Sequence, residues 1–96
     1  MRLASFRHKG LRLFYANDDP KALPPQLADK LRRLLFAIET ARTLEQVGLF
    51  PGWKLHRLKG DLKGFCSLNV SGNWRLIFRH DEQANTASDI DLVDYH

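Results

Sequence analysis

Two alternating runs joined by a short polar turn constrain the fold of this chain more than any other feature. In FCSLNV, residues 65–70, the side chains of Cys66, Leu68 and Val70 fall on one face of an extended strand. WRLIFRH, residues 74–80, alternates in the same way, and the Ser-Gly-Asn between the two runs is typical of a turn. We therefore expect an antiparallel hairpin. Its second strand places Trp74, Leu76 and Phe78 on one face and Arg75, Ile77 and Arg79 on the other.

An apolar stripe upstream predicts a helix that packs on this hairpin. Pro24 and Pro25 suit a helix start, because the first turn has no use for the missing N–H groups. The next apolar residues lie at i, i+4, i+7, i+8 and i+11, which is one face of a helix. These residues are Leu27, Leu31, Leu34, Leu35 and Ile38.

The remaining segments complete an α+β pattern. RLASFRH, residues 2–8, is compatible with a first strand, Gly10 is expected to interrupt, and LRLFY predicts a short helix that ends near NDDP. LEQVGLFPG carries loop punctuation, WKLHRLKGDLKG predicts a basic strand and loop, and IDLVDYH predicts a final strand. The order is strand, two helices, then antiparallel strands, with the helices on one sheet face and the other face open and basic. At 96 residues and 44% hydrophobic content, residues 1–96 should form a single domain.

Charge is distributed unevenly along the chain. Residues 1–80 hold all 15 Lys and Arg residues against six acids, whereas residues 81–96 hold five acids and no base. A basic body favours a polyanionic partner such as RNA or DNA, although a solvated surface has the same composition. A lone cysteine, Cys66, excludes an intramolecular disulfide and favours a reducing compartment, and no apolar segment predicts a signal peptide or a membrane span. We expect a cytoplasmic protein.

The candidate chemistry is that of phosphate. Arg75 and Arg79 share a strand face, and the HRLKGDLKG run brings His56, Lys59 and Lys63 to a glycine-bearing turn. The sequence contains no HxxxH or CxxC spacing, no GxSxG turn and no Gly-rich phosphate loop, so we expect no metal, cofactor or NTP. Metal-free RNA cleavage fits these residues: a base activates the ribose 2′-OH, cations stabilise the phosphate, and an acid protonates the departing 5′-oxygen.

The run WKLHRLKGDLKGFCSLNVSGNWRLIFRH and the ending VDYH resemble the HigB-type toxins of bacterial type II toxin–antitoxin modules, in the RelE superfamily. LKGD, NWR and terminal DYH in this order carry the resemblance, which extends over essentially the whole chain. It implies ribosome-dependent cleavage of messenger RNA, without a cofactor, and inhibition by a HigA-like helix-turn-helix antitoxin. By matching position it implies active-site roles for His56, Lys59, Arg75, Asp94, Tyr95 and His96. Around them, Lys54, Arg57, Lys63 and Arg79 are predicted to bind RNA.

His96 and His56 are the predicted proton carriers, and which is acid and which is base stays open. Lys59 and Arg75 would contact the scissile phosphate, Asp94 would orient an imidazole, and Tyr95 would stack on a base. The chain departs from the family's GxWS pattern at Cys66. In a regular final strand Tyr95 would share the face of Arg75 while Asp94 and His96 would not, so we expect pairing to stop near Val93.

Two alternatives stay open at this point. A ParE-like toxin would inhibit DNA gyrase without cutting RNA, but it has no use for terminal proton-transfer groups. A non-enzymatic nucleic-acid-binding module would display aromatic platforms among its cations, for which Tyr95 and Phe65 are the candidates.

Overall fold

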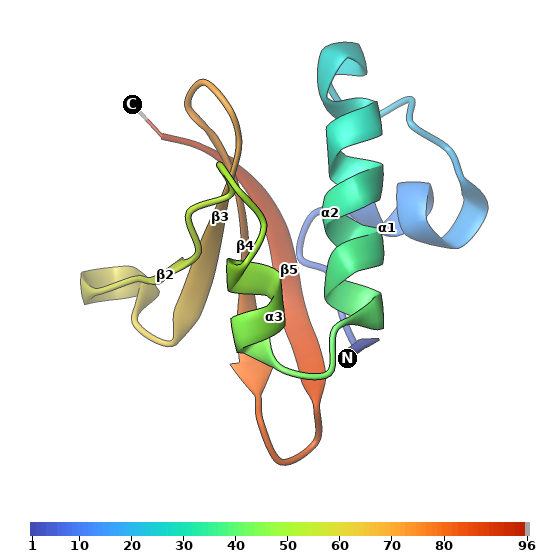
Figure 1. The fold of residues 1–96 in the computed structure, drawn as a ribbon. Coiled ribbons are helices and arrows are strands. Elements are labelled where there is room, and N and C mark those ends of the chain that lie inside the picture. Colours follow the sequence, from blue (N-terminus) through green and yellow to red (C-terminus); the bar gives the residue numbers. More distant parts are fainter. Residues whose placement is uncertain (96) are drawn as a thin grey trace.

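The computed structural model describes residues 1–95, which form an α+β fold built on one mixed five-stranded sheet (Figure 1). The strand order is β1-β5-β4-β3-β2. The elements in chain order are β1 (Arg2–Leu3), α1 (Lys9–Asn17), η1 (Pro25–Leu27), α2 (Ala28–Thr40), α3 (Leu44–Gly48), β2 (His56–Arg57), η2 (Gly60–Leu62), β3 (Phe65–Ser71), β4 (Trp74–Asp81) and β5 (Thr86–Asp94), where η marks a 3₁₀ turn.

The predicted hairpin is confirmed as β3 and β4. Cys66 pairs with Phe78 and Leu68 with Leu76, and all four side chains lie in the hydrophobic core. β5 pairs antiparallel to β4, whereas the two-residue β1 runs parallel to β5. After β1 the chain still exchanges backbone hydrogen bonds with β5, but it forms an isolated bridge at Phe6 and no further regular strand, so the expectation of one strand over residues 2–8 was too long.

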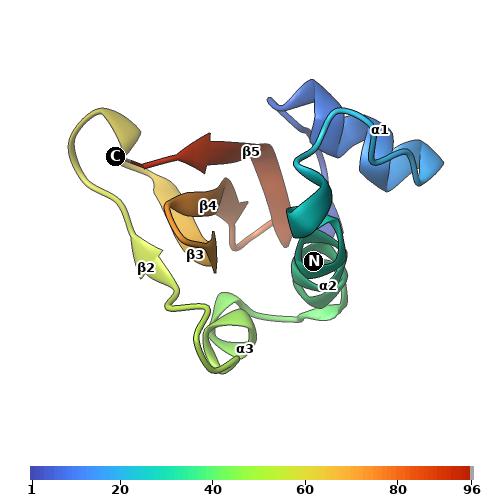
Figure 2. The same cartoon turned by 90° about the horizontal axis from the view of Figure 1, so that it is seen from above.

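Helix α2 forms as its apolar stripe predicts. Pro25 opens the preceding 3₁₀ turn, and Leu31, Leu34 and Ile38 of α2 are fully buried. Figure 2 shows α2 and α3 on one face of the sheet, with α1 flanking its β5 side. The Met1 ammonium donates to the carbonyls of Ile38 and Glu39 at 3.2 and 2.8 Å, where the helix dipole favours positive charge.

Two expectations about the helices were wrong. Gly10 does not interrupt α1 but lies buried inside it, where an added Cβ would come within 2.9 Å of the Ala22 carbonyl oxygen. The loop expected at residues 44–52 begins with helix α3, whose cap Thr43 accepts a hydrogen bond from the Gln46 N–H at 3.3 Å. The Gln46 side chain in turn accepts from the Arg42 N–H at 2.7 Å. Thr at the cap with Gln three residues later is a recognised helix start and was present in the sequence, although Gln46 here accepts from Arg42, the residue before the cap, and not from Thr43.

A bulge in β5 changes which of its residues face the open side of the sheet. Ile77 pairs with Asp91 but Arg79 pairs with Ser88, so one extra residue is accommodated in between. Asp89 takes a left-handed backbone there, with φ of 51°, a conformation that aspartate tolerates better than most residues. Consequently Ser88, Asp91 and Val93 all pair with residues of the Arg75–Arg79 face.

The sheet face away from α2 and α3 is less open than predicted. Ile77 is only 1% exposed, and Phe65 and Ser67 on the same face are also buried, so the expectation that this face is open was wrong for its centre. Arg75 is half-buried and Arg79 exposed on this face. Within residues 1–95 no helix has the length and apolar content that crossing a bilayer requires.

Candidate functional site

Arg75 and Tyr95 form the centre of one cluster on this sheet face. The Arg75 guanidinium lies 5.8 Å from the centre of the Tyr95 ring, within the range of a cation–π contact. The same guanidinium donates to the carbonyls of Gly72 and Trp74 at 2.8 and 2.9 Å. Both of these hydrogen bonds use one nitrogen, Nη1, which orients the guanidinium and, among residues 1–95, leaves Nη2 with no hydrogen bond that a phosphate would have to displace.

β5 ends one residue later than expected. Trp74 pairs with Asp94, and the Tyr95 N–H then donates to the Asn73 carbonyl at 2.9 Å. Pairing therefore ends within one residue of Val93, where it was expected to stop, with one further hydrogen bond from Tyr95. The register places Tyr95 on the Arg75 face, as strand alternation predicts, and Asp94 on the face of Trp74. His96, the predicted terminal proton carrier, lies outside the described residues.

His56 lies on the same sheet face with one ring nitrogen already engaged. Its Nδ1 is 3.0 Å from the carbonyl oxygen of Lys54. Because a carbonyl can only accept, Nδ1 carries the hydrogen in this contact, and the neutral ring then keeps its lone pair on Nε2. The ring is exposed, so Nε2 can take a proton from a bound substrate.

The register relates His56 to Arg75. His56 pairs with Ser67 and Ser67 with Ile77, so His56 is two strands from β4 and one row of side chains from Arg75. That spacing is about 10 Å across the sheet, which leaves room for a nucleotide between the imidazole and the guanidinium. Lys54 lies close to the row of Arg75 along the sheet. The carbonyl of the preceding Trp53 accepts from the Asn69 N–H at 2.7 Å, and Asn69 pairs with Arg75.

Lys59, which was predicted at the scissile phosphate, lies at the other end of the face together with the predicted RNA contacts Lys63 and Arg79. Lys59 and Lys63 flank the η2 turn and are exposed. This turn lies at the level of the start of β3, whereas the β3–β4 hairpin and the end of β5 lie at the top of Figure 1. Arg79 pairs with Phe65, the first residue of β3, and so belongs to the η2 end of the face. The structure therefore separates Lys59, Lys63 and Arg79 from the Arg75–Tyr95 cluster.

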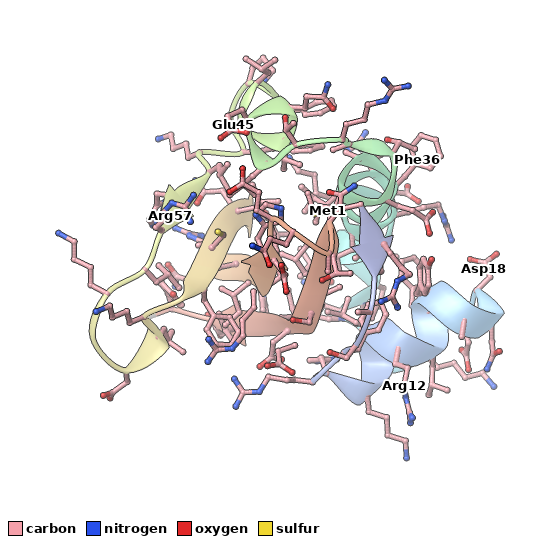
Figure 3. The ribbon with its side chains drawn as sticks, turned by 90° about the horizontal axis from the view of Figure 1, so that it is seen from below. Met1, Arg12, Asp18, Phe36, Glu45 and Arg57 are labelled. Carbon is pink, nitrogen blue, oxygen red and sulfur yellow. The ribbon has the colours of Figure 1, made fainter. Side chains whose placement is uncertain are left out.

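Arg57 does not join either group on this face. It pairs with Cys66, whose side chain lies in the core, and lines a small cavity with Glu45 of α3 (Figure 3). Burial raises the pKa of the Cys66 thiol, and the positive charge of Arg57 opposes that shift in part. Arg57 thus lies on the α3 side of the sheet, away from the Arg75 face, and our proposal gives it no role in RNA binding.

Two polar side chains on the site face were missed from the sequence. Asn69 pairs with Arg75, and Asp91 pairs with Ile77 in the row that contains His56. The alternation of β3 put Asn69 on this face, but Asp91 could be placed only once the β5 bulge had set its register. Across residues 1–95 no three potential ligand side chains gather as a metal site would require.

Two hollows formed by the described residues lie away from the site. Cavities of about 330 and 360 Å³ lie beside α2 and α3, lined in part by Phe36, Phe50 and Trp53. The Arg75–Tyr95 cluster, as far as residues 1–95 describe it, lies outside these two hollows, and Arg75 and Tyr95 are both half-buried.

Comparison with known proteins assigns the chain. The family model described as the RelE-like toxin of the type II toxin–antitoxin system HigB matches residues 4–96. This chain belongs to the HigB-like toxin family. It is 35% identical over 94 residues to Endoribonuclease HigB of Proteus vulgaris, covering 98% of this chain and 99% of that protein. Toxin HigB-1 of Vibrio cholerae is 33% identical over 75 residues, covering 77% of this chain and 79% of the relative. The resemblance stated from LKGD, NWR and DYH is confirmed.

Solved structures agree on the fold. The Escherichia coli YafQ structure has a TM-score of 0.62 at 18% identity and covers 98% of this chain and 93% of its own. A YoeB/ParE toxin from Agrobacterium tumefaciens gives the same TM-score at 16% identity, with 100% and 99% coverage. The predicted RelE-like α+β class is confirmed by these likenesses.

Proposed function

We propose that this HigB-family toxin is an endoribonuclease that cuts messenger RNA on the ribosome by metal-free acid–base chemistry. Membership of the HigB family supports the toxin class, and a nearly full-length relative that is an endoribonuclease supports the enzyme class. The observation that carries the mechanism is the placement of exposed His56, with Nδ1 held by a carbonyl, across the sheet from the Arg75–Tyr95 pair.

In the proposed reaction, His56 Nε2 takes the proton from a ribose 2′-OH. The 2′-oxygen forms a bond to the adjacent phosphorus while the bond from phosphorus to the 5′-oxygen breaks. Arg75 stabilises the charge that develops on the phosphate oxygens, and Tyr95 holds a neighbouring base by stacking. A second proton donor gives its proton to the 5′-oxygen, and His96 is our candidate. The products carry a 2′,3′-cyclic phosphate and a 5′-hydroxyl.

Ribosome dependence is part of this proposal. Attack by the 2′-OH requires the nucleophile, phosphorus and leaving oxygen in line, and a flexible single strand rarely holds this arrangement by itself. We infer that the ribosome supplies this geometry by holding the messenger in the decoding site. The proposed cellular partner is a HigA-like helix-turn-helix antitoxin, because the family is defined by type II toxin–antitoxin systems. Co-purification with the product of the neighbouring reading frame tests this partner.

The mechanism is tested with His56→Gln, and His80→Gln serves as the matched control. His80 is half-buried on β4 and pairs with Ala87, away from the Arg75 face. On ribosomes programmed with messenger, His56→Gln should slow cleavage by about 10²- to 10⁴-fold, while His80→Gln cleaves normally. End-group analysis should find the 2′,3′-cyclic phosphate. Full activity of a folded His56→Gln, or a 3′-hydroxyl product, would overturn the mechanism. Growth arrest accompanied by DNA damage instead of messenger loss would favour gyrase inhibition.

A further inference from the structure

A second group of cations surrounds Phe65, at the opposite end of the sheet face from Tyr95. The guanidiniums of Arg79 and Arg7 both lie over the Phe65 ring, at 4.3 and 5.6 Å from its centre. Phe65 is only 2% exposed, so the ring is a fixed support. Arg7 comes from the segment before α1, whereas Arg79 is on β4, so two distant parts of the sequence bring positive charge to one point.

Arg79 is held in place by two further contacts. Its Nε is 3.3 Å from the Asp89 carboxylate, and Asp89 sits on the β5 bulge with its N–H donated to the Ser5 hydroxyl at 2.8 Å. Gly64, at φ of 97°, leaves the space that Arg79 occupies, because a Cβ there would lie 2.7 Å from the guanidinium. Arg79 therefore has one defined position at the surface.

The position leaves Arg79 accessible. Its side chain is 48% exposed and that of Asp89 is 46% exposed. A guanidinium stacked on a ring keeps its N–H edge free, and the Asp89 contact engages Nε rather than the terminal nitrogens. An oriented, stacked, partly exposed arginine is well suited to bind a phosphate through two N–H groups.

We propose that Arg7 and Arg79, supported by Phe65, form a second phosphate-binding subsite that takes an RNA backbone phosphate away from the cleaved bond. This inference rests on the proposed function. Arg75 and Arg79 are four residues apart on β4, about 13 Å along the strand. The Arg75 guanidinium is held at the Gly72 carbonyl and that of Arg79 over the Phe65 ring, so as held they serve different phosphates. Lys59 and Lys63 flank η2 at the same end of the face and add positive charge.

The negative charge of Asp89 should oppose RNA binding at this subsite. Its carboxylate partly neutralises Arg79 and competes with an incoming phosphate for it. Removing the negative charge should therefore strengthen RNA binding, while removing either arginine should weaken it. If the ion pair served only to stabilise the fold, loss of either partner would act in the same direction.

The test measures binding of a 2′-O-methylated single-stranded RNA, which lacks the nucleophile and cannot be cut. Arg79→Gln and Arg7→Gln should each weaken binding by about tenfold and lower the slope of log affinity against log salt by about 0.7. Asp89→Asn should tighten binding a few-fold, and asparagine, like aspartate, tolerates the left-handed backbone at this position. Arg12→Gln is the charge-matched control, since Arg12 points outward from α1 (Figure 3) and should leave affinity unchanged.

A second arm measures binding to vacant ribosomes. If Arg7→Gln and Arg79→Gln lower only the oligonucleotide affinity, the bound phosphate belongs to the messenger. If they lower the ribosome affinity as well, ribosomal RNA also uses the subsite. Both results support the subsite. Unchanged affinity and salt slope for both RNAs in folded Arg7→Gln and Arg79→Gln would overturn the subsite, as would weaker binding by Asp89→Asn. Loss of antitoxin binding with normal RNA binding would also overturn it. His56→Gln should still bind RNA, so failure of the cleavage mechanism is distinguishable from failure of the subsite.

Discussion

At the scale of single residues, neighbours decide what each side chain can do. His56 and His80 are the same residue type on the same sheet, yet only His56 combines an exposed ring with an Nδ1 anchored on a carbonyl. Arg57 was predicted to bind RNA around an active site that contains Arg75, but their strand pairs place the two side chains on opposite faces of the sheet. The predicted roles of His56, Lys59, Arg75, Asp94, Tyr95 and His96 remain proposals. The cleavage assays test the roles of His56, Tyr95 and His96.

The buried thiol gives a prediction at this scale. Burial raises the pKa of Cys66 above its ordinary 9.0, and Arg57 opposes the shift only in part. At pH 8 iodoacetamide should therefore modify Cys66 about tenfold or more slowly than a free thiol, with the rate rising as denaturant opens the fold. Because the folded pKa is raised, the stability linked to this thiol is present below pH 9.0 and is lost as the pH rises through the folded pKa. Mass spectrometry measures the rate, and labelling as fast as free cysteine would contradict the prediction.

At the scale of elements, the irregularities of β5 position the site. The bulge at Asp89 places that carboxylate beside Arg79. It also sets the register in which Asp91 pairs with Ile77. The last ladder pair, Trp74 with Asp94, then sets Tyr95 beside Arg75. A strand without the bulge would turn every residue beyond it to the other face, because side chains alternate with a period of two.

The end of β5 can be removed to separate chemistry from folding. Deleting Tyr95 and His96 removes one described backbone hydrogen bond, from the Tyr95 N–H to the Asn73 carbonyl, and the cation–π contact with Arg75. We expect a loss of about 1–2 kcal/mol in the free energy of unfolding and the loss of messenger cleavage on ribosomes. Urea denaturation and the cleavage assay measure the two effects. Retained cleavage by the shortened chain would contradict the assignment of a function to the DYH ending.

At the scale of the whole molecule, one continuous core joins the helices to the sheet. Leu31, Leu34 and Ile38 of α2 belong to the same buried cluster as Leu68 and Leu76 of the hairpin. The opposite face of α2 exposes Phe36, whose side chain is 66% accessible. The positions of α2 and of the sheet face that carries Arg75 are thus coupled through apolar packing rather than through polar contacts.

Leu34→Ala and Phe36→Ala compare the two sides of α2. Leu34 is fully buried, so its truncation should lower the free energy of unfolding by about 2–5 kcal/mol through lost burial and a cavity. Phe36 is two positions along the same helix but exposed, so its truncation should change stability by about 0.5 kcal/mol or less. Chemical denaturation of both variants measures the difference. Equal effects would show that α2 does not pack as described.

Local pattern was sufficient for the parts of this protein that depend on neighbouring residues. Alternation over residues 65–80 predicted the β3–β4 hairpin, the leucine stripe predicted α2, and the order LKGD, NWR, DYH predicted the HigB family. Helix α3 was missed although Thr43 and Gln46 signalled its start, and Gly10 was taken for a break because glycine usually weakens a helix. These were errors in weighing local signals, not signals that the sequence lacked.

Long-range packing decided the rest. Nothing local to Asp89 indicates that β5 will accept an extra residue opposite Phe78, so the face of Asp91 and the partner of Arg79 followed only from the paired strands. Gly10 is required inside α1 because residue 22 approaches it, and Arg7 reaches Phe65 across a separation of 58 positions. Strand register and close approach each depend on two segments that are distant in the sequence. The tertiary structure alone therefore decided that the basic residues divide between the two ends of one sheet face.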